Sequence, residues 1–132
     1  MLKLIRKRDG FTLLELMIVI AIMGILVTLA QPSFKAAVTK SREAALRENL
    51  FNLRSVIDQY YADNAAYPNS LNDLVDKGYM RSIPVDPFTK QPDWYLHYYE
   101  GGDDPNDQAG GIDDVHSYSD AAGLNGVPYK DW

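Results

Sequence analysis

The longest apolar run in the chain extends from Phe11 to Ala30 and contains only three polar residues, Thr12, Glu15 and Thr28. An α-helix of about twenty residues spans the roughly 30 Å of hydrocarbon in a bilayer, because each residue adds about 1.5 Å. The run therefore predicts a transmembrane helix over residues 11–30. Basic residues immediately before such a helix favour a cytoplasmic N-terminus, and Lys7 and Arg8 stand there.

Beyond Phe34 the apolar residues keep to one helical face. Steps of four and three residues connect Leu46, Leu50, Leu53, Ile57 and Tyr60. The other positions of the helical circumference carry charged residues, namely Arg42, Glu43, Arg47, Glu48, Arg54 and Asp58. Residues 31–64 are thus expected to form an amphipathic helix that continues the transmembrane one. Proline has no N–H and its ring collides with the preceding turn, so we expect a kink near Pro32, or a short unwound section beside Gly24, rather than a helix end.

Residues 65–132 are expected to form a small globular domain. Ser70, followed three residues later by Asp73, is typical of a helix N-cap, and Gly78 ends the predicted helix 71–77. Residues 94–99 and 112–118 are rich in aromatic and β-branched residues and predict two strands. The expected fold is α+β: a long N-terminal helix of about fifty residues packs under a small antiparallel β-sheet, whose aromatic side chains cover the apolar stripe.

Charge is distributed unevenly along the 132 residues. The first ten residues carry four bases and one acid, a net +3, which leaves −8 for the remainder of a chain whose total is −5. The body therefore lacks the basic surface that nucleic-acid binding requires. The chain has no cysteine, so neither a disulfide nor a thiol nucleophile is available.

Three interpretations of the N-terminal segment compete. A cleaved secretory signal also has a basic start and an apolar middle, and Thr28, Leu29 and Ala30 resemble its small-residue cleavage site; however, a charged residue in that middle is poorly tolerated. A plain membrane anchor leaves Glu15 costing about 2.5–3.5 kcal/mol with no compensation. Neither interpretation explains the acid.

The third interpretation is a resemblance. The run Lys7-Arg8-Asp9-Gly10, followed by Phe11-Thr12-Leu13-Leu14-Glu15-Leu16, resembles the class III signal of type IV pilins and type II secretion pseudopilins. The resemblance implies that a prepilin peptidase removes residues 1–10 by cutting between Gly10 and Phe11, and that Phe11 is then N-methylated. Glu15 corresponds to the family's membrane acid. The new amine of one subunit would neutralise Glu15 of its neighbour, because opposite charges attract strongly at low dielectric.

Within that superfamily the chain most resembles the G-type major pseudopilin. Many major type IV pilins close a C-terminal loop with a disulfide, which this chain cannot form. The supporting residues are Tyr67-Pro68, Leu71, Leu74-Val75 and Ile83-Pro84-Val85-Asp86-Pro87-Phe88.

The resemblance implies a role that is structural, not enzymatic: a subunit of a periplasmic pseudopilus, held in the inner membrane before assembly, that supports protein export by type II secretion. The implied partners are other copies of the chain, minor pseudopilins, the peptidase, an inner-membrane platform protein and an assembly ATPase. A surface type IV pilin for adhesion, motility or DNA uptake is the nearest alternative. A small exported enzyme or calcium-binding domain is the alternative of another class.

Calcium is the one cofactor that we expect. The resemblance implies a calcium site in the loop after the second strand, where Ser117-Tyr118-Ser119-Asp120-Ala121-Ala122 keeps a serine and an acid but lacks two glycines. Hard cations prefer oxygen ligands; the candidates are Asp120, Asn125, Asp131 and the carbonyl of Tyr118. A solvated acidic surface is the alternative. His97 and His116 have no third orienting group at a recognisable spacing, which disfavours a transition-metal or catalytic site.

Overall fold

The computed structural model of the chain describes residues 10–107 and 109–132. The basic residues of the expected leader lie outside this range. The chain divides into two compact units, Met1–Val38 and Thr39–Trp132, and the first helix contributes to both. The elements are α1 (Leu13–Asn64), α2 (Leu71–Asp76), β1 (Tyr95–Tyr98), β2 (Ile112–His116) and the short 3₁₀ helix η1 (Tyr129–Asp131).

The first unit is the N-terminal part of α1. Every residue from Gly10 to Ala37 is exposed, including large apolar side chains such as Ile20, which is 58% exposed, and Leu29, which is 69% exposed. α1 is long and apolar enough to cross a membrane, as the apolar run predicts. The helix continues through both Gly24 and Pro32, so the unwound section expected beside Gly24 is wrong. The kink near Pro32 stays a prediction.

The second unit is built on the remainder of α1, whose apolar stripe is buried as predicted. Leu46, Leu53 and Ile57 are fully buried and Leu50 is 2% exposed. The strands supply Ile112 and Val115 to the same core, and α2 supplies Leu71 and Leu74. Transfer of such side chains out of water is worth about 1.5–3 kcal/mol each, so this stripe is the main source of the unit's stability.

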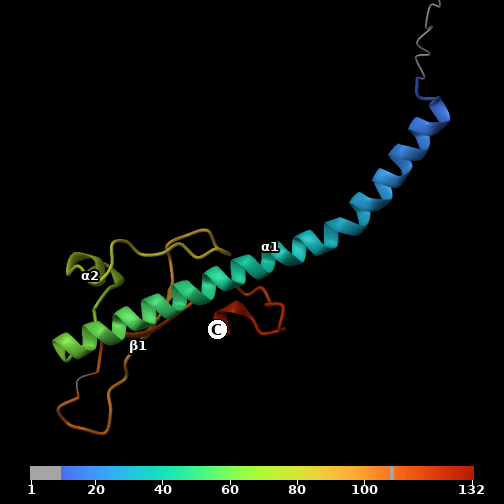
Figure 1. Ribbon diagram of the computed structural model, residues 1–132. Helices are drawn as coiled ribbons and strands as arrows, with labels where there is room; N and C mark the ends of the chain where they lie inside the picture. Colours follow the sequence, from blue (N-terminus) through green and yellow to red (C-terminus); the bar gives the residue numbers. More distant parts are fainter. Residues whose placement is uncertain (1–9, 108) are drawn as a thin grey trace, which may run out of the picture. The chain divides into compact units, whose positions relative to one another are not determined.

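The two strands pair antiparallel, in the order β1–β2. The sheet is irregular: His97 faces Asp114, but the next residue, Tyr98, faces Ile112, because the register shifts between these positions. A long helix and a small antiparallel sheet thus form the predicted α+β fold. Figure 1 shows the C-terminal segment beside the part of α1 that belongs to this unit, and the hydrogen bonds that Glu43 accepts from Leu124 and Tyr129 confirm the contact.

Two of the connections between elements are held in place by carboxylates that accept hydrogen bonds. At the start of α2 the Asp73 carboxylate accepts hydrogen bonds from the backbone N–H groups of Asn69 and Ser70, both at 3.1 Å, which is the capping predicted from the sequence. Gly78 follows with φ +79. Asp86, in the proline-marked loop, is fully buried and accepts hydrogen bonds from the Phe88 N–H at 2.8 Å and from the Ser117 hydroxyl.

The aromatic residues that cover the apolar stripe are only partly the predicted ones. Trp94 and Tyr60 are buried as expected, but Tyr95 and Tyr98 on β1 are 52% and 53% exposed. Side chains alternate between the two faces of a strand, which places Tyr95 on the face opposite Leu96, and the register shift after His97 interrupts this alternation at Tyr98. Only Leu96 of β1 packs against the core. Tyr129 of η1, 2% exposed, takes their place and stacks on Phe88 with ring centroids 3.8 Å apart.

Candidate functional site

The predicted cleavage and assembly residues stand at the start of α1. Gly10 and Phe11 precede the helix, and Phe11 is 87% exposed. Thr12 caps the first turn: its Oγ1 accepts a hydrogen bond from the Glu15 N–H at 3.1 Å, and its carbonyl accepts one from the Leu16 N–H at 3.1 Å. The threonine has a side-chain oxygen suited to this position.

Glu15 lies in this first helical turn. Its negative charge is favourable there because the exposed N–H groups give the helix start a partial positive charge. Within the part of the chain that the structure describes, Glu15 forms no ion pair, and it is exposed. Glu15 can therefore pair with a cation that the described residues do not supply.

The four expected calcium ligands line two different hollows. Tyr118, Asp120 and Asp131 line one hollow, which also contains Lys130. Asn125 lines a different hollow, and its Oδ1 accepts the Val127 N–H at 3.1 Å. The Asn125 side-chain oxygen thus already has a backbone partner in its own turn.

A lysine already neutralises one of the remaining carboxylates. The Lys130 Nζ lies 3.0 Å from Asp120 Oδ1, and this hydrogen bond raises the pKa of Lys130. No cluster of three or more metal-ligating His, Asp or Glu side chains occurs among residues 10–107 and 109–132. A cation bound here would need main-chain oxygens and would have to displace Lys130 from Asp120.

The anchor of this C-terminal loop is instead Glu43, which the sequence analysis placed on the charged part of the helix. Glu43 is 5% exposed. Its Oε1 accepts hydrogen bonds from the Leu124 N–H at 2.7 Å and from the Tyr129 hydroxyl at 2.9 Å. Burial, together with the bond to Glu43, raises the pKa of Tyr129 to about 12.

The spacing of the buried stripe indicates that Glu43 lies on the buried face of the helix. It stands three residues before Leu46 and so continues the buried stripe by one step. A polar residue on a buried face needs a partner, and only the three-dimensional structure identifies that partner. The loop passes close to Trp132 and Glu43 at Gly123. A Cβ at this position would lie 2.8 Å from the Trp132 ring, so a glycine is needed there.

The histidines pair with carboxylates of β2. His97 Nδ1 lies 2.6 Å from Asp113 Oδ1, and His116 Nε2 lies 3.2 Å from Asp114 Oδ2. The hydrogen bond to Asp113 raises the pKa of His97. Each histidine thus has a structural partner of its own.

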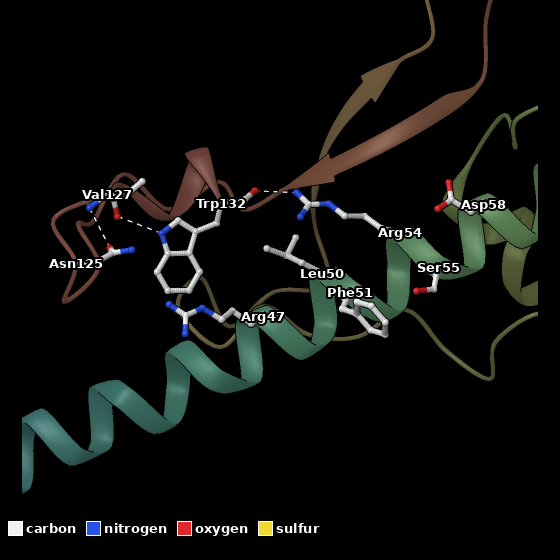
Figure 2. Close-up of a pocket in the computed structure, with 9 residues that line it drawn as sticks. All are labelled: Arg47, Leu50, Phe51, Arg54, Ser55, Asp58, Asn125, Val127 and Trp132. Carbon is white, nitrogen blue, oxygen red and sulfur yellow. Dashed lines mark hydrogen bonds between the residues drawn. The ribbon is translucent and has the colours of Figure 1, made fainter.

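An open hollow borders α1 on the side of the C-terminal segment (Figure 2). Leu50 and Trp132 supply apolar surface, and Phe51 is 70% exposed beside them. The Arg47 guanidinium lies 4.6 Å from the centroid of the Trp132 ring. Arg54 donates to Asp114 Oδ1 at 2.7 Å, to the Val115 carbonyl at 3.0 Å and to the Trp132 main-chain oxygen at 2.7 Å. The lining residues are Arg47, Leu50, Phe51, Arg54, Ser55, Asp58, Asn125, Val127 and Trp132.

Comparison with known proteins assigns these features to a family. Residues 5–30 match a family described as the prokaryotic N-terminal methylation motif. The chain is 31% identical over 99 residues to the type II secretion system core protein G of Pseudomonas aeruginosa, covering 63% of this chain and 70% of that protein. It is 34% identical over 99 residues to the protein of the same name from Klebsiella michiganensis, with the same coverage of 63% and 70%.

The core protein G of Vibrio cholerae is 32% identical over 102 residues, which are 66% of this chain and 70% of that protein. No solved structure matches the chain. The methylation motif, the long apolar helix and the similarity over most of the sequence agree. The chain therefore belongs to the family of the type II secretion system core protein G, the major pseudopilins of that export machinery.

Proposed function

We propose that the protein is a structural subunit of a periplasmic pseudopilus that supports protein export by a type II secretion system. The observation that supports this most directly is the methylation motif over residues 5–30, placed at the start of a helix whose apolar residues are exposed up to Ala37. Apolar side chains around a whole helix require lipid or other helices as surroundings. A filament of packed helices supplies the second of these.

Maturation begins with cleavage between Gly10 and Phe11 by a prepilin peptidase, followed by N-methylation of Phe11. The position supports cleavage at this bond, because both residues precede α1 and are exposed. A protease binds extended chain more readily than helix, so this segment suits its active site. Removal of the leader creates an amine at Phe11 and removes the basic residues that hold the helix in the inner membrane.

Assembly then pairs the amine of Phe11 in one subunit with Glu15 of a neighbouring subunit. The free acid at the first turn of α1 supports this role, because it forms no ion pair within the described residues. In a low-dielectric bundle of helices an unpaired carboxylate costs several kcal/mol, and a nearby cation offsets part of that cost. The acid thereby favours the polymer over the isolated subunit.

The remaining partners follow from the same assignment. Before assembly the subunit spans the inner membrane once, with its N-terminus in the cytoplasm and the acidic body in the periplasm. An inner-membrane platform protein and a cytoplasmic ATPase extract it, and minor pseudopilins share the fibre. The role is mechanical, and we assign no catalytic residue.

Calcium remains a separate proposal on a smaller set of ligands. Asp120, Asp131 and the carbonyl of Tyr118 border one hollow and have the oxygen chemistry that calcium prefers. Because Lys130 competes for Asp120, Lys130→Met should strengthen calcium binding. The test is the melting temperature of the full chain in detergent with calcium or with chelator, for both variants. An equal melting temperature in calcium and chelator for Lys130→Met would reject the site.

The experiment for the main proposal combines maturation, assembly and export. Native protein from a cell with a working secretion system should begin at an N-methylated Phe11 by intact mass and N-terminal sequencing. Glu15→Ala should keep this processing but lose fibre formation and export of the system's cargo. Glu48→Ala, an exposed acid in the same helix, is the matched control and should assemble normally.

Three outcomes would contradict the proposal. A native N-terminus at Gln31 would indicate a conventional secretory signal. Long surface fibres at native expression, with export unaffected by deletion of the protein, would indicate a surface pilin. Normal fibres from Glu15→Ala would reject the pairing of the acid with the amine.

A further inference from the structure

The N-terminal unit of α1 carries two charges with an uncharged segment between them. Glu15 lies in the first helical turn, and the next charged residue along the chain is Lys35. Residues 16–34 contain no Asp, Glu, Lys, Arg or His, and we call them the uncharged segment. Both charges belong to the unit that ends at Val38, and both are exposed.

The separation of the two charges matches the thickness of a bilayer. α1 is unbroken from Glu15 to Lys35 (Figure 1). Lys35 follows Glu15 by twenty residues, which correspond to about 30 Å at 1.5 Å per residue. The hydrocarbon of a bilayer is also about 30 Å thick. Side chains of a helix lean toward its N-terminus, so both charged groups are displaced in the same direction and their separation is kept.

The uncharged segment presents apolar side chains to its surroundings along its whole length. Every residue of the segment is exposed. The large apolar side chains that are more than half exposed include Leu16, Ile20, Ile25 and Leu29. Lipid is the surroundings that such a helix requires while its subunit is unassembled.

The few polar side chains of the uncharged segment are compatible with lipid. The Thr28 hydroxyl donates to the Gly24 carbonyl at 2.8 Å, so the helix itself satisfies a group that has no water in hydrocarbon. The other two, Gln31 and Ser33, stand within the last turn before Lys35. They therefore lie next to the membrane surface when Lys35 lies at that surface.

Phe34 and Lys35 have the chemistry of a membrane boundary. Phe34 is 71% exposed and supplies a large apolar side chain at the end of the segment. Lys35 forms no ion pair with any residue that the structure describes. A lysine at the end of a transmembrane helix buries its apolar stem and extends its charged group to the interface. The opposite charge at that interface is the lipid phosphate.

We propose that Lys35 binds the phosphate groups of the periplasmic leaflet and thereby fixes the depth of the unassembled subunit, with Glu15 at the cytoplasmic boundary of the hydrocarbon. This inference rests on the proposed function, because it concerns the subunit that the inner membrane holds before assembly. It assigns a lipid surface as the partner of Lys35, and it keeps Gly10 and Phe11 outside the hydrocarbon.

The proposed depth changes where the membrane centre lies along the helix. The apolar run of residues 11–30 is centred beside Ile20, whereas the pair of charges is centred at Ile25. These centres differ by about 7 Å along the axis. A bilayer centred on the apolar run would contain Glu15, and a carboxylate in hydrocarbon is costly. With Lys35 at the surface, Glu15 enters hydrocarbon only when the subunit moves outward to assemble.

The first test measures the depth of single nitroxide labels in the full chain, in vesicles of phosphatidylethanolamine and phosphatidylglycerol. The chain has no native cysteine, so each label reports one position. Collision rates with oxygen and with a neutral, water-soluble nickel chelate give the depth. Ile25→Cys should carry the deepest label, and Ile20→Cys should lie about 7 Å nearer the membrane surface. A depth maximum at Ile20→Cys overturns the inference.

The second test asks whether Lys35 sets this depth. The label on Ala37→Cys should contact water. Adding Lys35→Leu should move that label about 5 Å, one helical turn, toward the membrane centre, because the next base is Lys40. Lys35→Arg keeps the charge and should leave the depth unchanged. Lys40→Leu, which removes another exposed base of the same helix, is the matched control and should also leave it unchanged.

A third measurement tests the phosphate contact itself. In vesicles made only of a cationic lipid without phosphate, the shift caused by Lys35→Leu should fall to less than half, because the attraction is lost. An equal shift in the two kinds of vesicle would show that hydration alone holds the lysine at the surface, and it would overturn the contact.

The outcomes separate this inference from the function on which it rests. An unchanged depth in Lys35→Leu overturns the inference, while N-methylated subunits and normal fibres of the unmodified protein leave the function intact. Labels at Ile20, Ile25 and Ala37 that contact water equally would show that the helix does not enter the membrane, which contradicts the proposed function itself. All substituted side chains are exposed, so the globular unit should fold in every variant.

Discussion

The two parts of α1 differ in how far their apolar side chains are exposed. In the unit that ends at Val38 they are exposed all along the helix, and Met23, for example, is 58% exposed. In the unit that begins at Thr39 they form one stripe, and Leu46 and Leu53 are fully buried. The same secondary structure thus serves two purposes. The first part leaves its stabilising contacts to lipid or other subunits, and the second part obtains them from its own chain.

Polar groups follow the same division. Glu15 in the first part forms no ion pair within the described residues, whereas Glu43 in the second part accepts two hydrogen bonds from its own chain. Among the described residues no buried side-chain nitrogen or oxygen lacks a hydrogen-bond partner. The buried polar groups of the globular unit are therefore satisfied within the described residues, whereas Glu15 in the apolar part of the helix has no charged partner there.

The largest difference in stability should come from truncating one apolar side chain in each part. Leu53→Ala should lower the free energy of unfolding of the globular unit by about 2–5 kcal/mol, because a cavity remains in a packed core. Ile20→Ala should change it by less than about 0.5 kcal/mol, since an exposed side chain leaves no cavity. Denaturation of the full chain in detergent, followed by the fluorescence of its two tryptophans, Trp94 and Trp132, measures both. Equal effects of the two substitutions would contradict the comparison.

The next largest effect should come from the buried acid. Glu43→Ala should destabilise the globular unit by about 1–3 kcal/mol, because the Leu124 N–H and the Tyr129 hydroxyl lose their acceptor. Glu43→Gln keeps a carbonyl oxygen and should cost less. Glu48→Ala, on the exposed face, is the control and should be nearly neutral. The same denaturation experiment applies, and a Glu43→Ala variant as stable as the control would show that Glu43 does not anchor the loop.

The sequence predicted the elements better than the contacts between them. The spacing of Leu46 to Tyr60 predicted the buried stripe, since helical periodicity is a local property. The aromatic and β-branched residues likewise predicted both strands to within a few residues. Turn chemistry at Ser70 and Gly78 predicted the bounds of α2 for the same reason.

Long-range partners lay beyond this reasoning. Glu43 was placed with the charged surface residues because its partners, Leu124 and Tyr129, are about eighty residues away in the sequence. Asn125 was grouped with Asp120 by proximity in sequence, but the two residues line different hollows. A local pattern gives the face of a helix that is buried. It does not give the segment that covers that face.

A smaller effect should come from Arg54, which joins the helix to β2 and to the C-terminal segment. Arg54→Met removes hydrogen bonds to Asp114, Val115 and Trp132 but keeps the apolar stem. Because the group is partly exposed, we expect a loss of about 1 kcal/mol. The melting temperature measures it, and Arg42→Met, which removes an exposed base of the same helix, should leave it unchanged. A fall as large as that of Leu53→Ala would contradict this ranking.

The smallest effect should be a pH dependence from His97. Its hydrogen bond to Asp113 raises the pKa of His97 above the ordinary value of 6.5. The folded state therefore binds this proton more tightly than the unfolded state. The stabilisation is fully present below pH 6.5 and is lost as the pH rises through the higher folded pKa. Since the histidine is exposed, solvent screening keeps the change small.

The melting temperature of the full chain, measured at a series of pH values on either side of neutrality, reports this loss. His97→Gln should flatten the pH dependence in that window, because glutamine cannot be protonated. Asp113→Asn should flatten it as well, because the partner that holds the proton is gone. If both variants kept the slope of the unmodified protein, the titrating group would be another one.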